Sequence, residues 1–303
     1  MSRWPQLDVD RDHGTFAIIH LASQMLGKIR VAHAPWSNHG WHVALQPVAN
    51  GFSTLPTGAS GGRTFTLVLD LCEHAIVLRV SDGASDRVPL DSGSIAALHF
   101  SFVGMLDRHG LPSSFDGMPN EIEGALPFAQ DDAPRTYSRQ SAERLREAFA
   151  AIVPVFDAYR AGFIGKSSPT HFWWGSFDLA ASVFSGRKAP EHPGGVPGLP
   201  DRITREAYSR EVASVGFWAG GATQADPFFY SYLYPEPPGY REAKVAYGTY
   251  DTTFGEFVLP YAEAQKSDDP DRMLREFLQS AYEAGANLAK WDRPNLEREP
   301  VAP

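Results

Sequence analysis

Four stretches of the chain carry apolar residues at the three- and four-residue spacing of one helix face. They cover residues 15–29, 94–109, 141–162 and 269–288. Asp269 and Pro270 open the last stretch, as is typical of a helix N-terminus. Pro154 falls inside the third stretch, where its ring and its missing N–H predict a kink. The pattern therefore predicts four main helices, two in each half of the chain.

Short runs rich in β-branched and aromatic residues lie between these helices and favour strands. In the first half they are WHVALQPV, RTFTLVLDL, HAIVLRVSDG and RVPL. In the second half they are THFWWGSFDLAASVF, EVASVGFW, PFFYSYLYP and GEFVLP. Residues 114–138 are polar and contain three prolines, which predicts a connection with at most one short strand.

The two halves show the same order of predicted elements: a helix, several strands and a second helix. HGWHVALQPVANGFST, which begins at His39, aligns without gaps with HFWWGSFDLAASVFSG, which begins at His171, and five of the 16 positions are identical. This favours a duplication, although two unrelated halves of similar strand composition would show the same order. We expect an α+β fold of two fused similar halves, residues 1–135 and 136–303, each a mostly antiparallel sheet packed by helices. The second half has the longer loops, and the halves should form one compact unit.

Composition narrows the classes of function. The 303 residues are 43% hydrophobic and carry a net charge of −9. The apolar content supports a folded core, and the acidic balance argues against nucleic acid as a partner. A single cysteine excludes an intrachain disulfide framework. With no long apolar run and no signal-like N-terminus, we expect a cytoplasmic protein without a membrane partner.

Several long segments resemble an uncharacterised bacterial family, one of the domains of unknown function. The resemblance is carried by HFWWGSFDLA and SGRKAPEHPGG, and also by AYSREVASVGFW, FYSYLYPEP and FLQSAYEAGANLAKWDR. These segments occur in order and extend over most of the chain. The resemblance implies a bacterial protein. It implies no activity, because none is established for that family.

The segment HFWWGSFDLA contains the most unusual residue for a strand. Asp178 stands beside an apolar run, and a carboxylate inside a sheet is either paired or has a raised pKa. It is therefore a candidate general base or metal ligand, and alternatively a buried aspartate satisfied by backbone donors or an arginine. In one regular strand, Trp174 and Asp178 would share a face and His171 would lie on the other, unless a bulge at Gly175 changed the register.

Other polar residues near Asp178 in the sequence suggest a metal site. His171, His192 and Glu211 would add imidazole and carboxylate ligands that suit a divalent metal. The sequence has no HExxH motif, so the spacing itself gives no support for metal binding. Glu211 is also a candidate base, and His171 and His192 are candidate acids.

A second group of residues suits the binding of a substrate. Lys166, Ser167, Ser168 and Arg187 could hold a carboxylate or phosphate, or they could be solvated residues of a loop. Trp174 and Trp218 belong to aromatic clusters that are typical of small-molecule pockets and also of ordinary cores.

Several common site motifs are missing. Gly165-Lys166-Ser167 lacks the first glycine of a phosphate-binding loop, and no dinucleotide fingerprint occurs, so we expect no nucleotide cofactor. WGSFD lacks the second glycine of a serine-hydrolase nucleophile elbow.

These observations favour a small-molecule pocket in the second half or at the junction of the halves. The leading hypothesis is an enzyme that uses acid–base or metal-assisted chemistry on a small polar organic molecule. The alternatives are a ligand-binding module without turnover and an interaction scaffold with aromatic edges. The sequence gives no substrate, cofactor or oligomeric state.

Overall fold

The computed structural model describes residues 4–195, 200–223 and 225–298. Its helices are α1 Val9–His33, α2 Ile95–Arg108, α3 Arg139–Ala161, α4 Asp201–Ala207, α5 Tyr261–Lys266, α6 Pro270–Leu288 and α7 Arg293–Leu296. Short 3-10 turns are η1 Asn38–Gly40, η2 Ser60–Gly62, η3 Phe128–Gln130 and η4 Gly221–Thr223. None of these helices has the length and apolar character that a membrane span requires.

Two six-stranded sheets form the framework. The first has the order β1-β2-β4-β5-β6, with β3 paired to β4; the second has the order β7-β8-β9-β10-β12-β11. The first sheet contains β1 Gln46–Val48, β2 Gly51–Ser53, β3 Thr57–Gly58, β4 Thr64–Asp70, β5 Ala75–Val80 and β6 Ser85–Pro89. The second contains β7 His171–Trp173, β8 Asp178–Lys188, β9 Arg210–Trp218, β10 Phe228–Tyr234, β11 Thr249–Asp251 and β12 Glu256–Pro260.

The halves are similar in architecture. All strand pairs within each sheet are antiparallel. The first sheet is preceded by α1 and followed by α2, and the second is preceded by α3 and followed by α6 after the short α5. The predicted α+β fold of two similar halves is confirmed. The gapless repeat folds differently in its two copies, because His39 lies in η1 whereas His171 begins β7.

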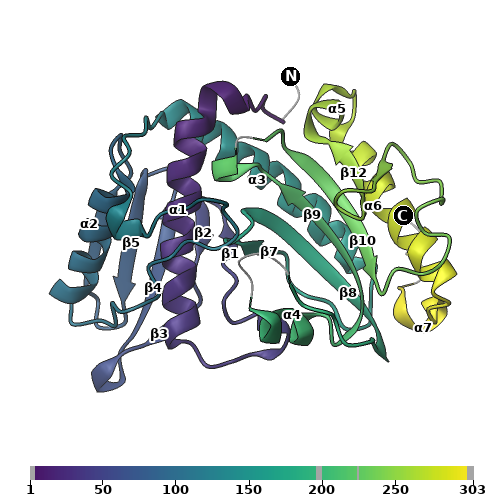
Figure 1. The fold of residues 1–303 in the computed structure, drawn as a ribbon, viewed down its shortest axis with the longest axis horizontal. Helices are drawn as coiled ribbons and strands as arrows, with labels where there is room; N and C mark the ends of the chain where they lie inside the picture. Colours follow the sequence, from purple (N-terminus) through teal and green to yellow (C-terminus); the bar gives the residue numbers. More distant parts are fainter. Residues whose placement is uncertain (1–3, 196–199, 224, 299–303) are drawn as a thin grey trace.

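Helix α1 lies between the halves and is almost fully enclosed. Every residue from Thr15 to Arg30 is buried, and the helix contacts α2, α3, β4 and η4. Figure 1 shows α1 crossing the region where the two sheets meet, with α2 at the left edge of the molecule and α6 at the right. The sequence predicts the apolar residues of this helix, but a helix that is buried all round needs neighbours from both halves.

The two sheets join edge to edge through the backbone. Phe172 in β7 and Leu45, just before β1, exchange two hydrogen bonds of 2.8 and 3.0 Å. The Phe172 ring stacks on Phe52 of β2 with 3.8 Å between centroids, and Phe149 of α3 packs edge-on against both rings. This aromatic cluster makes the core continuous across the junction.

The segment from His171 to Lys188 forms a hairpin instead of one strand, so the predicted arrangement of its faces is wrong. Trp173 pairs with Asp178 and His171 pairs with Ala180. Directly opposed residues share a sheet face, which puts His171 on the same face as Asp178. The other face of β8 is apolar and packs against α3.

Candidate functional site

A cavity of about 540 Å³ lies at the junction of the two halves. Its walls come from α1, the segment after η1, the segment 116–121, the β7–β8 hairpin, α4, β9 and β10. Six aromatic side chains line it: Trp41, Trp173, Trp174, Phe184, Tyr208 and Tyr230. Aromatic walls with a few convergent polar groups are typical of small-molecule sites.

Asp178 is the buried carboxyl of this cavity, with an exposed fraction of 5%. Ser176 Oγ donates a hydrogen bond to Asp178 Oδ1, and Tyr230 OH donates one to Oδ2. No Lys, Arg or His among the described residues forms an ion pair with it. Asp178 is therefore held by neutral donors and keeps the capacity to accept a proton or pair with a ligand.

A glycine across the sheet gives Tyr230 the space to reach Asp178. Tyr230 in β10 pairs with Gly216 in β9, and Gly216 in turn pairs with Ala180 in β8. A Cβ at Gly216 would lie 2.0 Å from the Tyr230 ring. The Tyr230 ring therefore lies over Gly216, and its hydroxyl reaches the Asp178 carboxyl two strands away.

A polar stripe on the buried helix α1 holds the opposite wall. His20, Gln24 and Lys28 recur every four residues and therefore share one helix face. His20 Nε2 donates to Gly175 O at 3.0 Å, since its Nδ1 accepts from a backbone N–H. The Gln24 amide bonds both backbone groups of Asn120, at 2.7 and 2.8 Å. These contacts fix the turn of the β7–β8 hairpin beside the segment 116–121.

Glu121 brings a second carboxyl to the cavity. Its Oε1 lies 2.1 Å from the position that a Cβ on Gly175 would occupy, so the carboxyl rests directly on the hairpin turn that precedes Asp178. The backbone of Glu121 has a φ of +58°, a conformation that costs energy for a residue with a side chain. Only a glycine at position 175 allows this close approach.

The carboxyl groups on this side of the second sheet share an unusual electrostatic environment. Burial raises the pKa of Asp178 to about 6, although the hydrogen bonds from Ser176 and Tyr230 oppose the shift. Burial, with repulsion from Asp178, raises the pKa of Glu121 to about 7. Burial also raises the pKa of Glu256 to about 8, with smaller contributions from Asp178 and Asp251. Two cavity carboxyls thus have proton affinities suited to transfer near neutral pH.

The two candidate histidines have different surroundings. His171 is buried, its ring lies 5.9 Å from Trp41 and 5.8 Å from Trp173, and burial lowers its pKa to about 4. His192 stacks on Tyr208, with 4.8 Å between ring centroids, and its Nδ1 accepts a hydrogen bond from the backbone of Gly194. Within the described ranges, no three His, Cys, Asp or Glu side chains are grouped so that they could hold a metal ion.

Lys166 does not line the cavity, but it packs against three residues that do. Its Nζ donates to His39 Nε2 at 2.7 Å and lies over the rings of Trp41 and Phe184. His39 Nδ1 donates to Ala207 O, so this imidazole is neutral and its Nε2 accepts a hydrogen bond from the lysine. Ser167 next to it forms a bridge with Val183 at the edge of the sheet, and it does not line the cavity.

Arg187 and Glu211 pair with each other away from the cavity. Arg187 Nη2 and Nε donate to Glu211 Oε2 at 2.6 and 2.9 Å, and the same arginine donates to the carbonyls of Ala289 and Lys290. Ser185 adds a third hydrogen bond to the Glu211 carboxylate. Neither residue lines the cavity. The structure shows them tying the edge of the second sheet to the end of α6.

The two candidate tryptophans differ in position, because Trp218 does not line the cavity. Trp174 lines the cavity and donates its indole N–H to Val43 O at 2.9 Å. A Cβ at Gly27 of α1 would lie 2.0 Å from this indole. Trp218 lies opposite Asp178 in the β8–β9 pairing and donates its indole N–H to Ser176 O.

Some residues of the cavity were not predicted, although the sequence contains patterns that mark part of them. In FFYSYLY, Phe228, Tyr230 and Tyr232 alternate, which places all three on one sheet face. The four-residue spacing of polar residues inside the apolar stretch 15–29 was a second signal. Nothing in the sequence marks Glu121, because its segment meets the hairpin only through long-range contacts.

The comparisons with known proteins give a family but no activity. A family model described as a family of unknown function, DUF5996, matches residues 4–298. The chain belongs to the DUF5996 family. No curated protein and no solved structure matches it significantly. The resemblance to an uncharacterised family is confirmed at this level, and any function of the DUF5996 protein has to be argued from its geometry.

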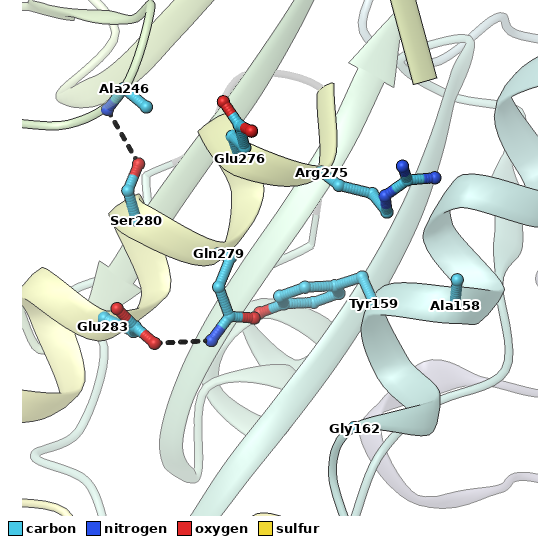
Figure 2. Close-up of a pocket in the computed structure, with 9 residues that line it drawn as sticks. All are labelled: Ala158, Tyr159, Gly162, Ala246, Arg275, Glu276, Gln279, Ser280 and Glu283. Atoms are coloured by element: carbon cyan, nitrogen blue, oxygen red, sulfur yellow. Dashed lines mark hydrogen bonds between the residues drawn. The ribbon is translucent and has the colours of Figure 1, made fainter. Parts of the chain in front are cut away.

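A second hollow in the DUF5996 protein has no comparable chemistry. It has a volume of about 570 Å³ and lies between α3 and α6. Figure 2 shows some of its polar groups bonded to one another, with Gln279 donating to Glu283 and the Ala246 N–H donating to Ser280. Two of its charged side chains, Arg275 and Glu276, are exposed, and the third, Glu283, is half-buried and paired with Arg293. Exposed, solvated groups of this kind are weak candidates for catalysis, so the cavity at Asp178 remains the candidate site.

The raised pKa of Asp178 predicts a pH-dependent stability for the DUF5996 protein. A carboxyl whose pKa rises from 3.8 to about 6 on folding favours the folded state below its unfolded pKa, and this contribution is lost as the pH rises through about 6. In Asp178→Asn the titration is absent. We therefore expect the unfolding free energy of the variant, relative to the unaltered chain, to increase by about 2 kcal/mol between pH 4 and pH 7.

Urea denaturation at pH 4, 5.5 and 7 measures this difference. The exposed Asp132 offers a matched control, because Asp132→Asn makes the same substitution outside the cavity. A constant difference for Asp178→Asn would show that this carboxyl has an ordinary pKa.

Proposed function

We propose that this protein binds a small organic molecule in the cavity at the junction of its halves and processes it by acid–base chemistry. The observation that carries the proposal is the state of Asp178. It is a buried carboxyl, bonded by two hydroxyl groups and without a cationic partner among the described residues, and it lines an aromatic cavity of about 540 Å³. Structural aspartates buried in a core are usually neutralised by arginine or by backbone donors.

The two cavity carboxyls suggest complementary roles. Asp178, with a pKa of about 6, is mostly ionised at pH 7 and would accept a proton from the ligand. Glu121, with a pKa of about 7, is about half protonated and could return a proton. Tyr230 would donate a hydrogen bond that steadies Asp178 in its ionised form. Carboxyl groups whose pKa values lie near the working pH are effective in acid–base catalysis.

A binding protein without turnover is the second candidate, because most of the lining is aromatic and apolar. The experiment begins with binding, which both candidates require. A library of small amines, acids, alcohols and amides is screened by the fluorescence of the tryptophans that line the cavity. Product formation from each hit is then followed by NMR. Product supports an enzyme, and binding without product supports the binding module.

Filling the cavity tests where the hits bind. Ala180 lines the cavity and is 5% exposed. Ala180→Trp should therefore weaken the binding of each hit by about 100-fold or more, because the indole takes the space of the ligand. Ala262→Trp on the exposed surface of α5 is the matched control and should leave affinity unchanged. Equal affinity in the two variants would place the ligand elsewhere and remove the proposal.

A further inference from the structure

The charges that line the cavity are unbalanced. Lys28 and Asp116 compensate each other, with 3.1 Å between Nζ and Oδ2. His39 contributes no charge, because its Nδ1–H is bonded to a carbonyl and its Nε2 accepts from Lys166. Two carboxyls remain, Asp178 and Glu121, and neither forms an ion pair with a cationic side chain of the described residues. The uncompensated charge of the lining is therefore negative.

Aromatic rings stand next to these carboxyls. Trp173 lies directly opposite Asp178 in the β7–β8 pairing, and both line the cavity. Tyr230 reaches the same carboxyl from the other side. The faces of Trp and Tyr attract cations, and a buried carboxylate supplies the charge-assisted hydrogen bond that an ammonium group donates to. The two features recognise the same chemical group.

The positive charge of Lys166 lies outside the lining of the cavity, beside Phe184. Its Nζ lies 5.4 Å from the centroid of Phe184. Phe184 is six residues along β8 from Asp178, which corresponds to about 20 Å of extended strand. Lys166 therefore faces the Phe184 end and does not neutralise the carboxyl pair.

We propose that the ligand is an organic amine with an apolar or aromatic body, bound as its ammonium ion. The ammonium group lies between Asp178, Glu121 and the ring of Trp173, and the apolar body extends along the aromatic wall toward Trp41. This inference rests on the proposed function only in that the ligand occupies this cavity. It adds the charge and the chemical class of the ligand.

Three compounds of similar shape and different charge test the inference. They are 2-phenylethylamine, 2-phenylethanol and 3-phenylpropanoate, measured by calorimetry at pH 7.5 with the full chain. We expect the amine to bind at least 10-fold more tightly than the other two. Tighter binding of the alcohol or the carboxylate overturns the inference, and so does the absence of amine binding.

Charge-neutralising variants give a second, independent readout. Asp178→Asn and Glu121→Gln should each weaken the binding of the amine by about 10-fold and leave the affinity for the alcohol unchanged. Glu263→Gln on the exposed surface of α5 is the control and should change neither affinity. Thermal unfolding of each variant checks that it folds. If Asp178→Asn does not fold, Glu121→Gln still provides the test. Unchanged amine affinity in the folded variants overturns the inference.

The outcomes separate this inference from the proposed function. If the alcohol or the carboxylate binds and Ala180→Trp removes that binding, the cavity is a ligand site and only the amine assignment falls. If library hits of every charge class bind the Ala180→Trp variant as well as the unaltered chain, the proposed function falls too.

Discussion

Replacement of Phe172 by alanine is expected to lower the free energy of unfolding by about 3–5 kcal/mol. The side chain is fully buried, stacks on Phe52 and packs against Phe149 and Phe177. Its removal leaves a cavity where the two sheets meet, and the rigid rings around it cannot close the space. Because the core is continuous there, the variant should still unfold in one transition at a lower urea concentration.

An exposed phenylalanine provides the control for this experiment. Phe100 on α2 is 80% exposed, and Phe100→Ala should change stability by no more than about 0.5 kcal/mol. Two separate transitions in Phe172→Ala would show that the halves fold independently. Equal losses in the two variants would contradict the role assigned to the Phe172 cluster.

Asp178→Asn is expected to reduce turnover of a substrate found in the ligand screen by about 100- to 10,000-fold. Asparagine keeps the size of the side chain but cannot accept the proton. In the unaltered chain, kcat/KM should rise with pH and level off above about 6, where Asp178 is ionised. Steady-state kinetics from pH 5 to 8 measure both effects.

A surface aspartate controls for the general effect of losing a carboxylate. Asp132 is exposed, and Asp132→Asn should leave kcat and KM unchanged. If Asp178→Asn keeps the turnover and the pH profile of the unaltered chain, Asp178 does not act as the base. Binding without any turnover in the unaltered chain would instead favour the ligand-binding alternative.

The main elements followed from local patterns in the sequence. The helix start at Asp269 and Pro270 is where the structure has it, with Asp269 accepting a hydrogen bond from the Arg272 N–H. The hairpin between β7 and β8 was missed for a physical reason. Its turn ends at Phe177, which adopts a φ of +67°, and a phenylalanine is not among the residues that normally mark such a turn.

Only part of the candidate site could be predicted from the sequence. Asp178 stood out because a carboxyl is unusual in an apolar strand, and Trp174 because it belongs to an aromatic cluster. Glu121 reaches the cavity only because α1 brings its segment to the hairpin, which no local pattern encodes. Glu211 and Arg187 were reasonable choices by residue type, but their mutual pairing depends on the register of β8 and β9.

The cavity wall is built partly from paired strands and partly from a segment outside the helices and strands, so its two parts can change independently among related chains. Asp178 and Tyr230 belong to paired strands, where a change of register would move many side chains at once. The wall opposite them includes Asp116 and Glu121, which lie outside the helices and strands. Substitutions there would alter the shape and charge that a ligand meets while the carboxyl on β8 stayed in place. The residues of one half can therefore change the shape and charge of the cavity while the other half retains the Asp178 carboxyl.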